Sequence, residues 1–237
     1  MKLRVAADER NPFLGLRSIR LSLRNVELFR TQLRAILRAS VLGNVRIMFP
    51  LISTLMELRQ ARMILADAME DLEEEGTPFD RDIQVGMMVE VPSAIVMLER
   101  FVDEVDFFSI GTNDLIQYVL AVDRGNKDVA NLYTAAEPAV LWLIKRAIEI
   151  ADAHQVAISM CGQMCGNPLY TMLLLGLGLR SMSLTPAHIP EVKHVCRSVS
   201  IAQCQQVAEQ TLLFDNARDV KTYLKKELTR ILPGLPV

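Results

Sequence analysis

The stretch Asp106-Phe-Phe-Ser-Ile-Gly-Thr-Asn-Asp114 (DFFSIGTND) is a short apolar run that passes directly into polar residues. Its nearly continuous apolar character is typical of a strand that is buried on both faces of a parallel sheet. Similar runs lie at 45–50 (VRIMFP), 84–90 (QVGMMVE), 156–161 (VAISMC) and 181–185 (SMSLT). Together with 106–111, they predict five strands.

Helical patterns alternate with these runs. They cover 26–38, 54–75, a segment that begins at Pro92, 137–154 and 167–178, and one or two helices fall within 203–232. Alternating strands and helices with short connections predict an α/β fold with a parallel sheet. The pattern leaves open whether the five βα units form an open doubly wound sheet or part of an eight-stranded barrel.

Composition narrows the class of protein. The 237 residues are 51% hydrophobic and 23% charged with a net charge of −2, so we expect a globular protein with no nucleic-acid or membrane partner. The first twelve residues contain no apolar segment of a secretory signal, and no apolar stretch is long enough to span a membrane. Four cysteines form no disulfide-dense pattern, which favours a cytoplasmic location.

Two carboxylates follow neighbouring predicted strands. Glu90 ends one apolar run, and Asp114 follows the next run along the chain. Because loops at the carboxyl ends of parallel strands share one face, these side chains are expected at the same rim. A pair of carboxylates with room for a substrate oxygen is a usual Mg²⁺ site. The alternative is that each carboxylate caps the helix that follows it.

Arginines give a second signal. Arg17, Arg46 and Arg124 lie in loop or strand-end contexts rather than on helix faces. A guanidinium binds phosphate through paired N–H donors, so these three are candidate phosphate ligands. Each alone is more often a solvated or ion-paired surface residue.

Cys161 ends the fourth run and is expected at the same rim. A cysteine there is often only a small buried hydrophobic residue, but the neighbouring carboxylates favour proton transfer or nucleophilic catalysis. Cys161 and Cys165 have a zinc-like spacing, yet no second pair or nearby histidine completes four ligands. The three histidines stand in no motif and are interpreted as structural.

Six motifs occur in order along the chain: Asn11-Pro-Phe-Leu-Gly-Leu-Arg-Ser-Ile-Arg20, Arg46-Ile-Met-Phe-Pro50, Gly86-Met-Met-Val-Glu-Val-Pro92, Asp106 to Tyr118 (DFFSIGTNDLIQY), Asp123-Arg-Gly-Asn126 and Met160-Cys-Gly-Gln-Met-Cys-Gly166. This set resembles the C-terminal domain of enzyme I of the bacterial sugar phosphotransferase system, the phosphoenolpyruvate–protein phosphotransferases. The resemblance covers roughly residues 9–200. It implies a TIM-type (β/α)₈ barrel.

The resemblance also implies an activity and a site. Mg²⁺ would bind Glu90 and Asp114, and Arg17, Arg46 and Arg124 would hold the phosphate with Asn113 beside them. Cys161 would protonate the enolate carbon as pyruvate leaves. The phosphoryl group would pass from phosphoenolpyruvate to a histidine on another domain and then to a small phosphocarrier protein, and the chain would form a homodimer.

Departures from the family pattern shape the remaining expectations. Only the last five strands are recognised, so we expect an N-terminally truncated, incomplete barrel over 1–200 and a helical tail of the same domain over 201–237. The usual glutamate after Cys-Gly is Gln163. Two alternatives remain: a phosphoenolpyruvate-binding or regulatory fragment without catalysis, and a relative of pyruvate phosphate dikinase or phosphoenolpyruvate synthase.

Overall fold

A computed structural model describes residues 11–235 of the chain. Residues 1–10 hold most of the segment on which the expectation about a secretory signal rests, and they lie outside the described part.

Five parallel strands form one sheet, as the sequence predicts. They are β1 (Ile47–Phe49), β2 (Val85–Val89), β3 (Phe107–Gly111), β4 (Ala157–Cys161) and β5 (Met182–Ser183). The strands lie side by side in chain order, β1-β2-β3-β4-β5, and every pair is parallel. A doubly wound sheet reverses its strand order, whereas successive strands of a barrel simply follow one another. The α/β class and the incomplete sheet of five βα units are therefore confirmed.

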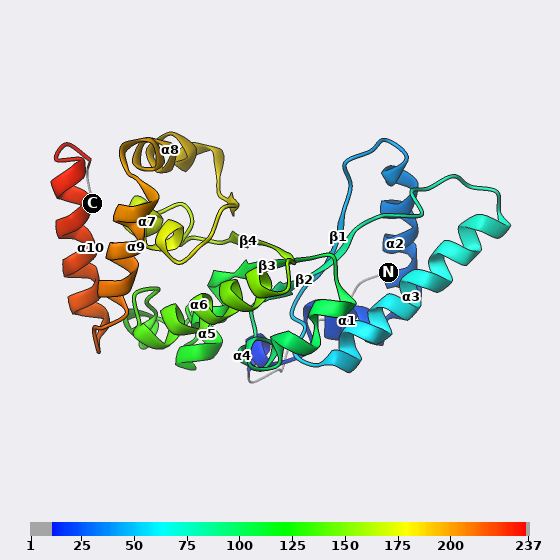
Figure 1. Cartoon of the computed structure of the whole chain (residues 1–237). Coiled ribbons are helices and arrows are strands. Elements are labelled where there is room, and N and C mark those ends of the chain that lie inside the picture. Colours follow the sequence, from blue (N-terminus) through cyan, green and yellow to red (C-terminus); the bar gives the residue numbers. More distant parts are fainter. Residues whose placement is uncertain (1–10, 236–237) are drawn as a thin grey trace.

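Helices connect and flank the strands: α1 (Ser18–Arg24), α2 (Val26–Ser40), α3 (Leu55–Glu74), α4 (Pro92–Val96), α5 (Thr112–Leu120), α6 (Pro138–Ala153), α7 (Pro168–Gly176), α8 (Ile189–Ser198), α9 (Ile201–Thr211) and α10 (Ala217–Ile231). Short 3-10 turns lie between them: η1 (Pro12–Leu14), η2 (Leu98–Arg100), η3 (Val102–Glu104), η4 (Ala130–Leu132) and η5 (Pro186–His188). Figure 1 shows α4, α5 and α6 together on one side of the sheet, with α2 and α3 at one end and α7 to α10 at the other. None of the helices among residues 11–235 is both long and apolar enough to cross a membrane.

The two faces of the sheet differ in burial. Side chains on one face are buried, among them Ile47, Phe49, Val85, Met87, Val89, Phe108, Ile110 and Met160. On the other face Met48 is 38% exposed, Ala157 is exposed, and Met88 and Ser159 are half-buried. The expectation of strands buried on both faces is therefore wrong for β1 and β4, which lie toward the edges of a sheet that does not close. It holds for most of β2 and β3, where Gly86, Ser109 and Gly111 on this face are buried.

Up to residue 235, every regular element after β5 is a helix. Two helices, α9 and α10, occupy the stretch for which one or two were predicted, and both pack against α7. Ser200 begins α9 with a capping box that includes Gln203, and Asn216 caps α10 through the Asp219 N–H. Three helices lie outside the predicted ranges: α1, α5, which starts immediately after β3, and α8.

Candidate functional site

One row of residues crosses the sheet at the carboxyl ends of its strands. Gly111 of β3 pairs with Cys161 of β4, and Cys161 pairs with Ser183 of β5. Glu90 reaches the same level, because it follows Val89, which pairs with Ile110. Since alternate residues of a strand point to the same face, Glu90, Gly111 and Cys161 share the face that the helices leave partly exposed. A Cβ atom added at Gly111 would lie 2.5 Å from Glu90 Oε2. The missing side chain at 111 is therefore what allows the Glu90 carboxylate to lie over β3.

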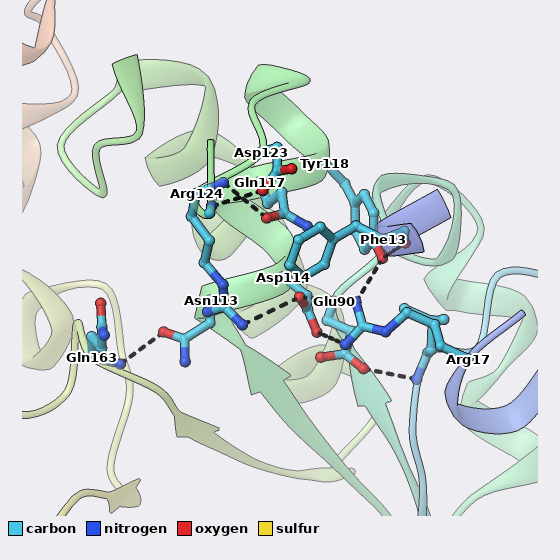
Figure 2. Close-up of polar contacts among 12 residues, drawn as sticks. Phe13, Arg17, Glu90, Asn113, Asp114, Gln117, Tyr118, Asp123, Arg124 and Gln163 are labelled. Atoms are coloured by element: carbon cyan, nitrogen blue, oxygen red, sulfur yellow. Dashed lines mark hydrogen bonds and ion pairs between the residues drawn. The ribbon is translucent and has the colours of Figure 1, made fainter. Parts of the chain in front are cut away.

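Asp114 lies in the first turn of α5, where it holds two arginines (Figure 2). Arg17 Nη1 donates to Asp114 Oδ1 at 3.3 Å and Arg17 Nη2 donates to Oδ2 at 3.1 Å. Arg124 Nη2 lies 3.8 Å from Oδ1. The N-cap of α5 is Gly111, not Asp114. The capping alternative is therefore wrong for Asp114, whose carboxylate is an anchor for cations.

Arg17 is fixed by two aromatic residues that were not predicted as part of the site. Its Nη1 also donates to the Tyr118 hydroxyl at 3.1 Å, and its guanidinium stacks 5.5 Å from the centre of the Phe13 ring. The Tyr118 hydroxyl in turn donates to the Phe13 carbonyl oxygen. Tyr118 and Phe13 belong to motifs quoted above, but only the fold shows that they meet across more than one hundred residues of sequence.

Arg124 comes from the loop after α5, and a buried side chain sets its position. Its backbone N–H donates to Gln117 Oε1 at 3.2 Å. The next turn is closed by Asp123, whose Oδ1 accepts from the Gly125 N–H at 2.7 Å. Both guanidinium groups remain partly exposed, with side-chain exposures of 29% for Arg17 and 34% for Arg124. Two arginines that are far apart in the sequence thus converge on one carboxylate and remain partly exposed.

Glu90 is buried, at 5% exposure, and carries an elevated pKa. Burial raises the pKa of its carboxyl group to about 7, against a smaller lowering by the Leu51 N–H, and the nearby Asp114 charge adds to the rise. Glu90 Oε1 accepts that N–H at 2.8 Å. Leu51 is held in the left-handed region, with φ of 55°, which a leucine rarely adopts. The local backbone thus supports the carboxylate at the rim.

Replacing Glu90 by glutamine is expected to stabilise the metal-free protein at alkaline pH. The folded pKa of about 7 lies above the ordinary 4.5, so the folded state holds the extra proton and wild-type stability falls as pH rises between those values. The loss reaches about 3 kcal/mol above pH 7. Glutamine keeps the oxygen that accepts the Leu51 N–H and carries no charge. Urea unfolding at pH 4 and pH 8 measures the difference.

A surface variant controls for the change of charge. Glu70→Gln alters an exposed residue of α3 and is expected to change the free energy of unfolding little at either pH. If Glu90→Gln differed from wild type equally at pH 4 and pH 8, the unfavourable burial of its charge would be refuted.

Asn113, in the first turn of α5, connects this helix to the loop after β4. Its Oδ1 accepts from the Gln163 backbone N–H at 3.0 Å, and Thr112 Oγ1 donates to the Cys161 carbonyl oxygen at 3.0 Å. Gly162 has φ of +110° and no room for a side chain, because an added Cβ would collide with Thr112 Oγ1. The contact to residue 163 uses its backbone, so it is independent of whether glutamine or glutamate stands there.

Cys161 is half-buried beside a cavity of about 770 Å³ that Asn113, Gln163 and His188 also line. Burial raises the pKa of its thiol, against a smaller lowering by a hydrogen bond with Ser109, so the sulfur stays protonated at neutral pH. Cys165 is buried at 1% exposure, and burial raises its thiol pKa to about 12. Of the two thiols, Cys161 is thus the one that borders an open space.

Arg46 does not belong to this group, which corrects its expected place. It precedes β1 at the amino end of the sheet, and its guanidinium stacks 5.5 Å from the centre of the Phe107 ring. Phe107 is the first residue of β3, so this contact also lies at the amino ends of the strands. The strand direction therefore separates Arg46 from Arg17 and Arg124, which meet at the carboxyl ends.

The donor set suits a magnesium ion. Mg²⁺ is commonly held by one or two carboxylates together with substrate phosphates and waters. Glu90 and Asp114 supply two carboxylates close enough for the charge of one to raise the pKa of the other. Among residues 11–235, no cluster of three or more histidine, cysteine, aspartate or glutamate side chains could hold a metal by itself. Ligands from a substrate would therefore have to complete the site.

Comparisons with known proteins identify relatives that use phosphoenolpyruvate. A family model described as "PEP-utilising enzyme, PEP-binding domain" matches residues 2–201. The phosphoenolpyruvate–protein phosphotransferase of Geobacillus stearothermophilus is 46% identical over 218 residues, and that of Bacillus subtilis (strain 168) is 45% identical over 218 residues. Both alignments cover 92% of this chain and 38% of the relative.

A solved structure shares the fold. A citrate lyase from Burkholderia xenovorans LB400 superposes with a TM-score of 0.51 at 18% identity, over 85% of this chain and 68% of the other. At that identity the likeness concerns the arrangement of helices and strands and not the ligands.

Proposed function

Since this chain belongs to the family of PEP-binding domains of PEP-utilising enzymes, we propose that it is the phosphoenolpyruvate-binding part of a phosphoenolpyruvate–protein phosphotransferase. The observation that carries the proposal is the convergence of Arg17 and Arg124 on Asp114, beside Glu90 and in the neighbourhood of Cys161. The chain spans 38% of the length of the curated relatives it matches, so the rest of the activity is assigned to other parts of a longer protein.

Glu90 and Asp114 would hold Mg²⁺, which supplies charge neutralisation for a transferring phosphoryl group. Arg17 and Arg124 are placed to bind phosphate oxygens, because each guanidinium is partly exposed and already directed at the carboxylate that would hold the ion. Asn113 uses its Oδ1 within the protein, which leaves its amide nitrogen as the donor toward phosphate. Arg46 is left out of the proposed ligands because it lies at the opposite ends of the strands.

Cys161 is proposed as the acid that protonates the enolate carbon. Loss of the phosphoryl group from phosphoenolpyruvate leaves enolpyruvate, and a proton delivered to its methylene carbon gives pyruvate. The raised thiol pKa keeps Cys161 in the protonated form that can donate. Its place beside the cavity and in the same row as Glu90 supports contact with the carbon end of a ligand whose phosphate is bound by the arginines.

The partners follow from the proposed reaction. The phosphoryl group would pass to a histidine on a domain outside this chain and then to a small phosphocarrier protein. We further propose that residues 1–200 form the partial barrel domain with 201–237 as its helical tail, that the chain is a homodimer, and that it acts in the cytoplasm.

Calorimetry of phosphoenolpyruvate binding tests the proposal. The purified chain is expected to bind phosphoenolpyruvate saturably with Mg²⁺ and not with EDTA. Glu90→Ala is expected to lose that binding while its circular dichroism remains that of wild type, because one of two carboxylate ligands is gone.

Two results would contradict the proposal, one from the wild type and one from the variant. Absence of Mg²⁺-dependent binding by a folded wild-type chain would refute the proposal that this part alone assembles the site. Binding retained in Glu90→Ala would refute the metal assignment.

A further inference from the structure

A smaller cavity lies between η1 and the end of α5, and Phe13, Gln117 and Tyr118 are among the residues that line it. Its volume is about 230 Å³, and none of Glu90, Asp114 and Cys161 lines it. Its walls are mainly apolar, with contributions from Phe13, Leu14 and Val122. Ligand pockets for drug-sized molecules are larger, at about 300–1,000 Å³, so this one has room for a smaller molecule.

A buried amide lines this cavity without a complete set of partners. Gln117 is 3% exposed, and its Oε1 accepts the Arg124 backbone N–H at 3.2 Å. Its Nε2 has no hydrogen-bond partner among the described residues. If the amide were flipped, its N–H₂ group would face the Arg124 N–H, and two donors would oppose each other. The oxygen therefore accepts from Arg124, and the nitrogen is the atom without a hydrogen-bond partner. A buried donor of this kind costs free energy unless an acceptor reaches it.

The charge of the residues that line the cavity favours a neutral hydrogen-bond acceptor over an anionic one. Among residues 11–235, Asp123 is the only charged residue that lines the cavity, and no lysine or arginine side chain of this part of the chain does so. An anion such as a phosphate ester is disfavoured there. A carbonyl oxygen on a neutral, mostly apolar molecule would instead accept from Gln117 Nε2 and cover Phe13 and Val122. We propose that this cavity is a second ligand site, for a small neutral carbonyl compound, and that its occupancy is coupled to the arginine pair.

Residues that line the cavity also contact each of the two arginines, and these contacts would couple the cavity to the arginine pair. Phe13 and Tyr118 line the cavity and hold Arg17, through a ring contact of 5.5 Å and a hydrogen bond of 3.1 Å. Gln117 lines the cavity and holds the Arg124 backbone. Both cations on Asp114 are thus held by residues that a ligand in this cavity would touch. Figure 2 shows Phe13, Gln117 and Tyr118 above Asp114, with Arg124 to its left and Arg17 to its right.

Nuclear magnetic resonance of the ¹⁵N-labelled chain tests the proposal with 2-piperidone, a neutral cyclic amide, as the probe. The Gln117 side-chain N–H₂ signals are expected to shift saturably as the probe is added. The Nε–H signals of Arg17 and Arg124 are expected to shift with the same apparent Kd. None of these signals requires phosphoenolpyruvate. Binding of 2-piperidone can therefore succeed or fail independently of the proposed phosphoenolpyruvate binding.

Two variants locate the binding. Leu14→Trp places a large side chain in the cavity from an exposed position, and Gln117→Met removes the donor. Each is expected to weaken binding at least about tenfold. Leu132→Trp is the matched control, at an exposed leucine that does not line the cavity, and is expected to bind as wild type does.

Three results would overturn the inference. If the probe produced no saturable shift, the cavity would be a site for water only. Binding unchanged in both Leu14→Trp and Gln117→Met would place the probe elsewhere. Binding that left the Arg17 and Arg124 signals in place would overturn the coupling.

Discussion

Replacing Asp114 by alanine is expected to weaken Mg²⁺-dependent phosphoenolpyruvate binding at least about 100-fold, the upper range seen when even outer-shell partners of a metal are lost. The loss is large because Asp114 is both a proposed ion ligand and the group on which Arg17 and Arg124 converge. Without it, two like charges remain close together with no carboxylate between them. Calorimetry measures the affinity, and circular dichroism checks the fold.

The same helix and loop provide a matched control. Asp123 is an exposed carboxylate in the loop that carries Arg124, and its Oδ1 accepts the Gly125 N–H. Asp123→Asn keeps that acceptor while removing one negative charge, so it is expected to bind phosphoenolpyruvate within about threefold of wild type, as a solvent-screened charge should. If the two variants lost affinity equally, general electrostatics would explain the loss and Asp114 would not be a specific ligand.

Cys161→Ala, introduced into the full-length parent protein, is expected to slow pyruvate formation by about 10² to 10⁴-fold, the range for a lost general acid. Phosphoenolpyruvate binding is expected to change little, because the arginines and carboxylates are untouched. The sulfur is half-buried beside the larger cavity, and its raised pKa keeps its proton on at neutral pH. Single-turnover measurement of pyruvate, together with the Kd for phosphoenolpyruvate, separates the two effects.

A second thiol in the same segment controls for packing. Cys165 is buried, and its burial raises the thiol pKa to about 12. Cys165→Ala is expected to reduce stability, as a buried truncation does, and to leave the rate of pyruvate formation largely intact. Should Cys161→Ala impair binding as much as it impairs turnover, a packing role would explain it better than proton transfer.

Much of the framework could be predicted from residues alone. Continuous apolar runs predicted all five strands, because a strand in a parallel sheet is covered by helices and needs apolar side chains. The polar residues that ended those runs predicted which ends of the strands carry the candidate site. Glu90, Asp114 and Cys161 do lie at those ends in the structure. Their proposed roles remain predictions.

Other features depended on contacts between distant segments. Arg46 was grouped with Arg17 because both lie in loop or strand-end contexts, although Arg46 is the second residue of the predicted strand 45–50. The structure separates the two, because β1 begins at Ile47 and the Arg46 guanidinium stacks on Phe107 at the amino ends of the strands. Likewise, no spacing in the sequence links Phe13 to Tyr118, yet the hydrogen bond between them fixes Arg17.

Local sequence patterns were thus enough to predict the α/β class, the presence of five βα units, and the two carboxylates and the cysteine at the strand ends. These features are local, since they depend on apolar runs and on the residue at which each run stops. The tertiary structure alone decided which arginines face Asp114, that burial raises the pKa of Glu90 to about 7, and that Gln117 Nε2 is left without a partner beside a cavity. Those features depend on desolvation and on distances between atoms far apart in the chain, which only packing brings together.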